Sequence, residues 1–204
     1  MKKLVVAMLG LAMLVGCTSE PTKPAEPEKP KGPDVLTGRE AFQKMFIQAR
    51  HWATDAQPYR LQSQANSDSK GRDGKSAIWR SGFASPGQMR ASKPFMWSGT
   101  DASDAPSRGV SFGTEDTYSP TNTNTRIFDT AYLKTDSDAA FNVAQKHGGD
   151  KVLEKNPDLP VIYILDFNRS NELVWHVIYG ADRDNAKLRI AVNASTGDYM
   201  HVEK

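Results

Sequence analysis

Three stretches near the C-terminal end alternate apolar and polar residues, and this pattern constrains the fold more than any other feature. Every second residue is apolar in 161–167, 173–179 and 188–194. Side chains of a β-strand point alternately to two faces, so each stretch predicts a strand with one buried face. The segments between them are rich in Asn, Asp, Ser and Gly, which favour turns. The sequence therefore predicts an antiparallel meander, continued by a last strand at 199–202.

In both halves of the chain, apolar residues at helical intervals precede the predicted strands and predict a helix. Residues 136–146 place Ala140, Phe141 and Ala144 on one face, and a glycine pair follows at 148–149. In the first half, Thr37 and Glu40 have the spacing of a capping box, and apolar residues then recur every three or four positions over 42–53. Shorter strands are predicted at 59–64, 76–79 and 93–98. The expected fold class is α+β, with one or two units of a helix packed on an antiparallel meander sheet.

A polar tract at 99–125 separates the two halves. It is dense in Gly, Ser, Thr, Asp, Asn and Pro and has no periodicity, which indicates a boundary region with a mobile surface loop. We expect an N-terminal α+β unit at 37–126 and a second α+β unit at 127–204. Trp79 stands in the first half where Trp175 stands in the second, and the alanines of the two predicted helices correspond as well. The loops differ in length, so the sequence leaves open whether the first half is a divergent copy of the second or an unrelated unit.

The second unit contains three motifs that occur together in a known family. They are the helix Asp138-Ala139-Ala140-Phe141-Asn142-Val143-Ala144, the strand Leu173-Val174-Trp175-His176-Val177 and the hairpin Ala191-Val192-Asn193-Ala194-Ser195-Thr196-Gly197-Asp198. With these motifs the unit resembles a PepSY domain. In that family the hairpin usually carries Asp where this chain has Asn193. The resemblance implies a PepSY- or cystatin-like fold over about 135–204 and a role in restraining peptidases. The first half would be a divergent second copy.

Residues 1–16 have the pattern of a targeting segment. Lys2 and Lys3 precede an apolar run of about a dozen residues, ~18 Å as a helix, which is too short for a ~30 Å hydrocarbon core. The run ends in Leu14-Val15-Gly16-Cys17, which resembles the lipobox of bacterial lipoproteins. The resemblance implies cleavage before Cys17 and lipid on this cysteine, the only one in the chain. The alternative is an ordinary signal peptide.

Residues 17–36 form a proline-rich segment, with proline at every third position from Pro21 to Pro33. Polyproline II has three residues per turn, so this segment predicts a semi-rigid spacer between lipid and body. A PxxP ligand for an SH3-like partner is the alternative. Removal of Lys2 and Lys3 leaves 24 basic against 24 acidic residues. No basic stripe remains for phosphate backbones, so nucleic acid is not expected as a partner.

The search for catalytic and metal-binding patterns predicts no enzyme, no cofactor and no metal. Gly109-Val110-Ser111-Phe112-Gly113 fits G-x-S-x-G, but no helix pattern follows to form a nucleophile elbow. Histidine pairing, for instance His176 with His201, is a weaker alternative to structural roles. The acids of the polar tract lack the EF-hand spacing. The residues weighed as sites are His51, His147, His176, His201, Asp101, Asp104, Glu115, Asp116, Trp79, Trp97 and Trp175.

The expected function is that of a non-catalytic cell-envelope lipoprotein that binds a protein partner. The PepSY resemblance implies that this partner is a peptidase, which the protein would restrain. Membrane attachment would run through Cys17. Thr18, in the place where Asp commonly directs inner-membrane retention, favours the outer membrane facing the periplasm. The partner segment is expected to pair with an exposed sheet edge near 199–202. The alternative is a structural or small-ligand-binding lipoprotein with a pocket between helix and sheet.

Overall fold

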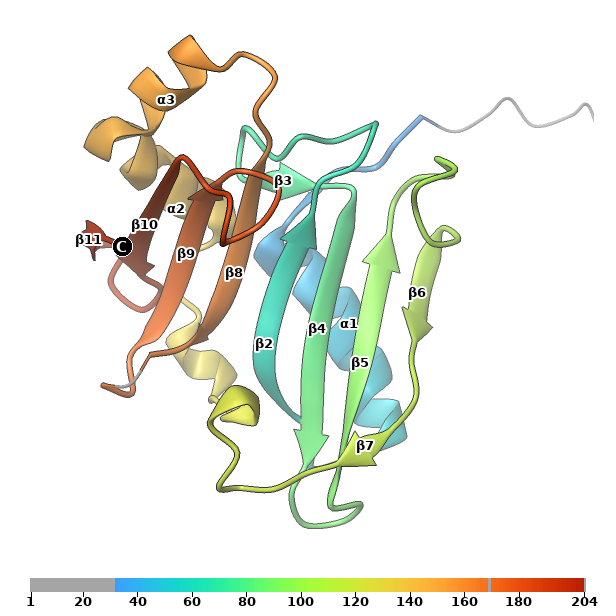
Figure 1. The fold of residues 1–204 in the computed structure, drawn as a ribbon. Helices are drawn as coiled ribbons and strands as arrows, with labels where there is room; N and C mark the ends of the chain where they lie inside the picture. The colour runs from blue at the N-terminus through green and yellow to red at the C-terminus, as the bar shows by residue number, and fades with distance from the viewer. Residues whose placement is uncertain (1–31, 169, 204) are drawn as a thin grey trace, which may run out of the picture. The chain divides into compact units, whose positions relative to one another are not determined.

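The computed structural model describes residues 32–168 and 170–203 and confirms the α+β class (Figure 1). The segments 1–16 and 17–31, with Cys17 and most of the predicted spacer, lie outside the described residues. In chain order the elements are β1 (Leu36–Thr37), α1 (Gly38–Trp52), β2 (Gln57–Gln64), β3 (Lys75–Ser76), β4 (Ile78–Ser85), β5 (Ala91–Ser98), β6 (Gly109–Phe112), β7 (Asp116–Thr117), α2 (Ser137–Ala144), α3 (Asp150–Lys155), β8 (Val161–Phe167), β9 (Leu173–Tyr179), β10 (Leu188–Asn193) and β11 (Tyr199–Val202).

Nine of the strands form one antiparallel sheet. Its order is β11-β10-β9-β8-β2-β4-β5-β6, and β7 pairs with the far end of β5. The four strands predicted in the C-terminal third are confirmed as β8 to β11. The first strands of the two halves, β2 and β8, meet at the centre, where Leu61 pairs with Leu165 and Gln62 with Ile164. We call this junction the seam. Because it joins the halves edge to edge, both halves share this sheet, and residues 32–204 form one compact unit. The strands β1 and β3 pair separately in a two-stranded sheet.

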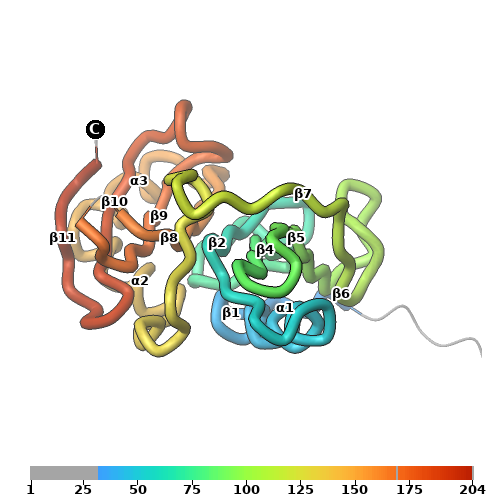
Figure 2. The backbone as a smooth tube through the Cα atoms, turned by 90° about the horizontal axis from the view of Figure 1, so that it is seen from below, coloured from blue at the N-terminus to red at the C-terminus, as the bar shows by residue number. Residues whose placement is uncertain are grey.

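The helices cover one face of the sheet, with α1 behind β4 and β5 and α2 behind β9 and β10 (Figures 1 and 2). The capping box at the start of α1 is confirmed: the Thr37 N–H donates to Glu40 Oε2 at 2.9 Å, and the Glu40 N–H donates to Thr37 Oγ1. The apolar residues that recur every three or four positions in this helix face the core, since Phe42, Met45 and Ala49 are all buried. The helix ends at Trp52, six residues before Pro58, which lies inside β2.

Two expectations about irregular segments need correction. The tract 99–125, predicted to be a boundary loop, contains β6 and β7. The strand β6 escaped detection because only Val110 and Phe112 give it an apolar alternation. The helix predicted to run through Lys146 ends at Ala144, and Gly148, with φ of 108°, breaks the helical geometry. The chain then forms the short helix α3 before it enters β8.

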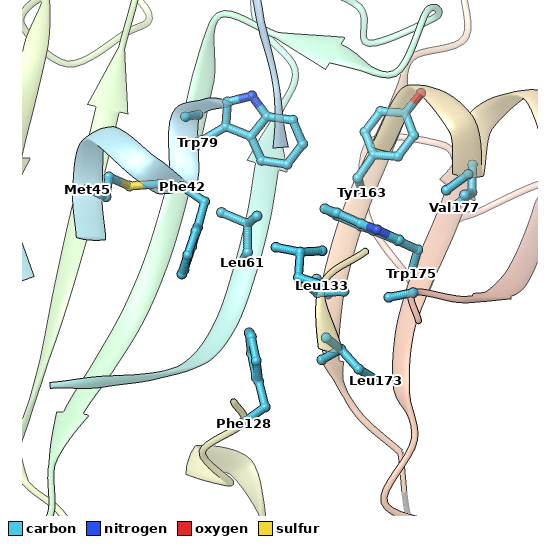
Figure 3. Close-up of a cluster of buried hydrophobic side chains, with 14 of the residues drawn as sticks. Phe42, Met45, Leu61, Trp79, Phe128, Leu133, Tyr163, Leu173, Trp175 and Val177 are labelled. Carbon is cyan, nitrogen blue, oxygen red and sulfur yellow. The ribbon is translucent and has the colours of Figure 1, made fainter. Parts of the chain in front are cut away.

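One hydrophobic core fills the space between helices and sheet, and both halves contribute to it (Figure 3). The predicted inner faces of β8, β9 and β10 all lie in this core. Trp79 and Trp175 are each fully buried, and their ring centroids are 6.3 Å apart. Since aromatic rings bury large apolar areas, these two indoles anchor the centre of the molecule. This placement confirms that they are core residues.

The two tryptophans make the same contact in their own halves. The Trp79 Nε1–H donates to the carbonyl of Leu36 at 3.0 Å, and the Trp175 Nε1–H donates to the carbonyl of Thr135 at 2.9 Å. Each acceptor lies one residue before the N-cap of the helix of that half. In each half a helical segment also precedes a row of four neighbouring strands, β2-β4-β5-β6 in the first half and β8-β9-β10-β11 in the second, and the first half adds the short β7. This correspondence supports the hypothesis that the first half is a divergent copy of the second.

Residues at the N-terminus of α2 cap the N-terminus of α1. The first N–H groups of a helix have no partner within that helix. Here the Gly38 N–H donates to Ser137 Oγ at 2.7 Å, and the Arg39 N–H donates to Asp136 Oδ1 at 2.9 Å. The Ser137 hydroxyl donates in turn to the Gly74 carbonyl at 2.5 Å. The two halves are therefore locked together by hydrogen bonds at the helix starts as well as by the seam.

Candidate functional site

The face of the sheet opposite the helices, called here the outer face, carries the principal polar cluster. Trp175 points into the core, so its neighbour His176 points to the outer face. The bulge in β2 after Pro58 turns Tyr59 and Arg60 to the same side. The segment 123–124 crosses this face before the chain passes under the end of the sheet to Phe128 and Leu133, which lie in the core (Figure 2).

His176 lies between two carboxylates. Its Nε2 is 3.1 Å from Asp166 Oδ1, and its Nδ1 is 2.5 Å from Glu203 Oε1. Arg60 Nη1 is 3.3 Å from Asp166 Oδ2, and Arg183 Nη2 is 3.4 Å from Glu203 Oε2. Positive and negative groups thus alternate across β2, β8, β9 and the C-terminal end. We call these five residues the outer-face network.

The network favours a charged imidazole. Burial by itself would lower the pKa of His176, but the hydrogen bonds with Asp166 and Glu203 outweigh burial and raise that pKa above its ordinary value. Burial would raise the pKa of the Glu203 carboxyl, yet the bonds with His176 and Arg183 lower it to about 2. At neutral pH the site therefore contains an ionised Glu203 beside a histidine that readily holds a proton.

A cleft of about 1030 Å³ opens over this network. We call it the outer-face cleft. A smaller cleft of about 520 Å³ adjoins it, and Arg183, His201 and Glu203 line both. The remaining lining of the larger cleft is polar apart from Phe167 and Tyr59. Its residues are Tyr59, Arg60, Thr123, Asn124, Arg126, Asp166, Phe167, Asn168, His176, Arg183, His201 and Glu203. This cleft lies on the side of the sheet away from the helices, whereas the sequence suggested a pocket between helix and sheet.

The structure separates most of the residues weighed from the sequence. Ser111 lies in the edge strand β6, which pairs with β5 and leads to β7, so the strand-to-helix turn of a nucleophile elbow does not follow it. Asp101 is paired with Arg108, while Asp104 accepts bonds from Ser67. Glu115 accepts from the Trp52 indole at 2.8 Å and from Lys93 at 3.2 Å.

Two of the four histidines meet at the outer-face cleft. His176 and His201 both line it, as the pairing hypothesis requires, but both ring nitrogens of His176 are bound to carboxylates. His51 is exposed on α1, and the ring of His147 stacks on Tyr199 with centroids 3.7 Å apart. Within residues 32–168 and 170–203, no group of three or more His, Cys, Asp or Glu side chains is arranged to hold a metal ion.

Sequence reasoning missed four members of the outer-face network: Arg60, Asp166, Arg183 and Glu203. The alternation of apolar residues does place Asp166 and His176 on the polar sides of their strands. What it does not supply is the register, which brings Glu203 opposite Arg189 at the end of β11 and Arg60 beside β8. The sequence pattern therefore indicated that Asp166 and His176 lie on the polar sides of neighbouring strands. It did not indicate that Arg60, Arg183 and Glu203 join them.

The free edges of the sheet are β6 and β11. The strand β11 is exposed, as expected, but it is four residues long and carries a bulge where Ala191 and Val192 of β10 face Tyr199–His201. The strand β6 pairs with β5 in unbroken register, from Phe95 opposite Phe112 to Ser98 opposite Gly109. Its Phe112 side chain is 63% exposed, the highest value among the large hydrophobic residues described.

Comparisons with known proteins identify a similar fold. No protein-family model matches the chain, and no curated protein matches it. Among solved structures, the chain is similar to the crystal structure of a "putative lipoprotein" from Clostridium difficile 630, with a TM-score of 0.52 and 13% sequence identity. The match covers 87% of this chain and 95% of that one. None of the helices in the described part of the chain is long and apolar enough to cross a membrane. At this identity the likeness establishes a shared α+β fold over most of both chains.

Proposed function

We propose that the protein is a lipid-anchored, non-catalytic protein of the cell envelope that binds an extended segment of a protein partner. The lipobox-like Leu14-Val15-Gly16-Cys17 and the proline-rich spacer support the anchor. The name given to the Clostridium difficile protein, which shares the fold, agrees with it. The C-terminal resemblance to PepSY domains supports a peptidase as the partner.

The observation that carries the binding proposal is the regular edge of β6. The Gly113 N–H donates to the Pro94 carbonyl at 2.9 Å. Since hydrogen-bonded pairs alternate along an antiparallel ladder, the N–H and C=O groups of Val110 and Phe112 point away from β5. Within the described residues no further strand pairs with them. A partner segment could therefore add to the sheet at this edge by β-augmentation.

The side chains around β6 suit such an addition. Phe112 is exposed on the same face as Phe95, and the Lys93 ammonium lies 4.5 Å from the centre of the Phe112 ring. Trp52, at the end of α1, packs against Phe95. The side chains of an added strand that point to the helix side of the sheet would therefore contact the apolar surface of Phe112, Phe95 and Trp52. The bulge in β11 makes that edge a poorer template, because bulges disrupt the ladder and protect exposed edges.

The anchor is tested by mass spectrometry of the membrane form, which should find the mature chain starting at a lipidated Cys17. Fractionation of the native envelope should place it in the outer membrane of a two-membrane bacterium, facing the periplasm. An unmodified Cys17 in the membrane fraction would contradict the anchor.

Binding is tested by inhibition. The detergent-purified full chain should slow a secreted metallopeptidase of the same organism at a stoichiometric ratio. Phe112→Asp should weaken that effect, whereas Val202→Asp, a matched change on the other edge, should leave it intact. The reverse pattern would move the docking site to β11. No inhibition across a panel of such peptidases would remove the peptidase proposal, and hydrolysis by this chain that is lost in Ser111→Ala would contradict the non-catalytic proposal.

A further inference from the structure

The outer-face cleft has more cationic than anionic groups. Arg60, Arg126 and Arg183 line it together with two histidines, against only two carboxylates. Both carboxylates are already engaged: Asp166 bonds to Arg60 and His176, and Glu203 bonds to His176 and Arg183. The cleft therefore presents a surplus of positive charge to anything that enters it.

Two of the guanidinium groups retain donors. Arg126 donates through Nη1 to the Asn168 carbonyl at 3.1 Å and to Asn171 Oδ1 at 2.8 Å, and these bonds hold its guanidinium in place. Arg183 reaches Glu203 through Nη2 alone, and the same nitrogen lies 3.1 Å from His176 Nδ1. Within the described residues, the remaining N–H groups of both side chains have no bonded acceptor. A guanidinium offers five N–H donors in a planar fork, which fits the oxygens of a carboxylate or a phosphate.

The size and the neutral lining of the cleft suit a small molecule. Its volume of about 1030 Å³ is near the upper end of the ~300–1,000 Å³ range typical of ligand pockets. Thr123, Asn124 and Asn168 add hydroxyl and amide groups, and Tyr59 and Phe167 add aromatic rings. Such a mixture provides hydrogen bonds for orientation and apolar surface for contact.

We propose that the outer-face cleft is a binding site for a small ligand that carries an oxyanion, either a carboxylate or a phosphate, held by Arg126 and Arg183. His201 lies at the junction of the two clefts, where it contacts the rest of the ligand. The outer-face network fixes Arg183 through Glu203 and keeps the two carboxylates neutralised, so the entering anion is not repelled. This site is separate from the β6 edge and does not depend on the function proposed above.

The test uses isothermal titration of the detergent-purified full chain with two probes, citrate and inorganic phosphate, at constant ionic strength set with sodium chloride. At least one probe should bind, and the identity of that probe distinguishes a carboxylate from a phosphate site. Arg126→Gln and Arg183→Gln should each weaken binding by about tenfold or more, as expected for loss of a charge-assisted hydrogen bond. Arg50→Gln, which removes the same charge from exposed α1 on the other face, should have no effect.

A second measurement guards against variants that unfold. In the wild-type chain, the imidazole NMR signals of His176 and His201 should shift during the titration, while that of exposed His51 should stay in place. Binding of neither probe at millimolar concentration would overturn the proposal. So would an equal loss of affinity in Arg50→Gln, because that result would indicate non-specific attraction by net charge.

Discussion

The indole rings of Trp79 and Trp175 meet edge to face, with centroids 6.3 Å apart and planes inclined at 72°. One ring belongs to each half of the molecule, and each indole N–H reaches the carbonyl just before the helix of its own half. Edge-to-face pairs are a favoured aromatic geometry and add about 0.5–1.5 kcal/mol beyond area burial. The contact therefore couples the position of each helix to the packing of the other half.

Trp175→Ala should lower the free energy of unfolding by ~3–5 kcal/mol, the usual range for truncation of a buried aromatic residue. Trp175 is fully buried, and its loss removes the contact with Trp79 and leaves the Thr135 carbonyl without its donor. Urea denaturation followed by circular dichroism gives the value. Tyr132→Ala, at a 52% exposed position, is the control and should change stability little. A loss below about 1 kcal/mol for Trp175→Ala would mean that the indole is not a core anchor.

Gly38→Ala should destabilise the protein by about 1–3 kcal/mol, the cost of overpacking a core. A Cβ on Gly38 would lie 2.6 Å from Trp175 Cη2 and 3.2 Å from Trp79 Cη2. Alanine favours a helix over glycine by up to about 1 kcal/mol, so a net loss isolates the steric effect. Gly32→Ala provides the matched control, because no atom lies within 4 Å of its added Cβ. Equal melting temperatures for the two variants would count against the tight fit at Gly38.

Ser137→Ala should cost about 1–3 kcal/mol, the penalty for leaving buried polar groups unsatisfied. The hydroxyl accepts from the Gly38 N–H and donates to the Gly74 carbonyl, and Ser137 is fully buried. Ser107→Ala, on the exposed surface, should be near neutral. Thermal unfolding of the three proteins checks this, and the prediction fails if the Ser137 variant unfolds with the wild type.

Stability should depend on pH through His176. Its pKa is raised in the folded state despite burial, by hydrogen bonds to Asp166 and Glu203. The resulting stabilisation is complete below the unfolded-state pKa of ~6.5 and is lost as pH rises through the higher folded-state pKa. His176→Gln should abolish this loss. For Glu203 the sign is opposite: its stabilisation is present above the ordinary carboxyl pKa and is lost as pH falls through about 2.

The His176 pKa is measured directly by NMR titration of its imidazole. Glu203→Gln should move this pKa downward, because it removes one of the two carboxylates that hold the proton. A wild-type value at or below ~6.5 would show that burial outweighs the hydrogen bonds.

The parts of the fold that follow from local chemistry were predictable from the sequence. The Thr37–Glu40 capping box and the alternation in β8, β9 and β10 depend on residues close together in the chain, and the structure confirms them. The strand β6 was missed because four residues with two apolar side chains carry too weak a periodic signal. The outer face of β8 and β9 also departs from a simple polar pattern, since Ile162, Ile164 and Ile178 form a second buried cluster there.

The outer-face network required information that local patterns do not contain. Arg60 and Asp166 are 106 residues apart and meet because β2 and β8 pair at the seam. Glu203 lies near the chain end and reaches His176 through the pairing of β10 with both β9 and β11. Such contacts depend on strand register, and register is decided by the whole sheet.

The seam itself has a consequence for chains that are cut or shortened between the halves. Only Leu61–Leu165 and Gln62–Ile164 are paired across it, yet it is what shields β2 and β8 from solvent. A fragment that ends between β7 and α2 would expose the whole of β2 as a new eight-residue edge, with Leu61 uncovered. Beyond the bulge after Pro58, the unpaired N–H and C=O groups of this edge can pair with any strand that offers a ladder, including a second copy of the same fragment. Separating the halves in this connection would therefore create an edge that favours self-association.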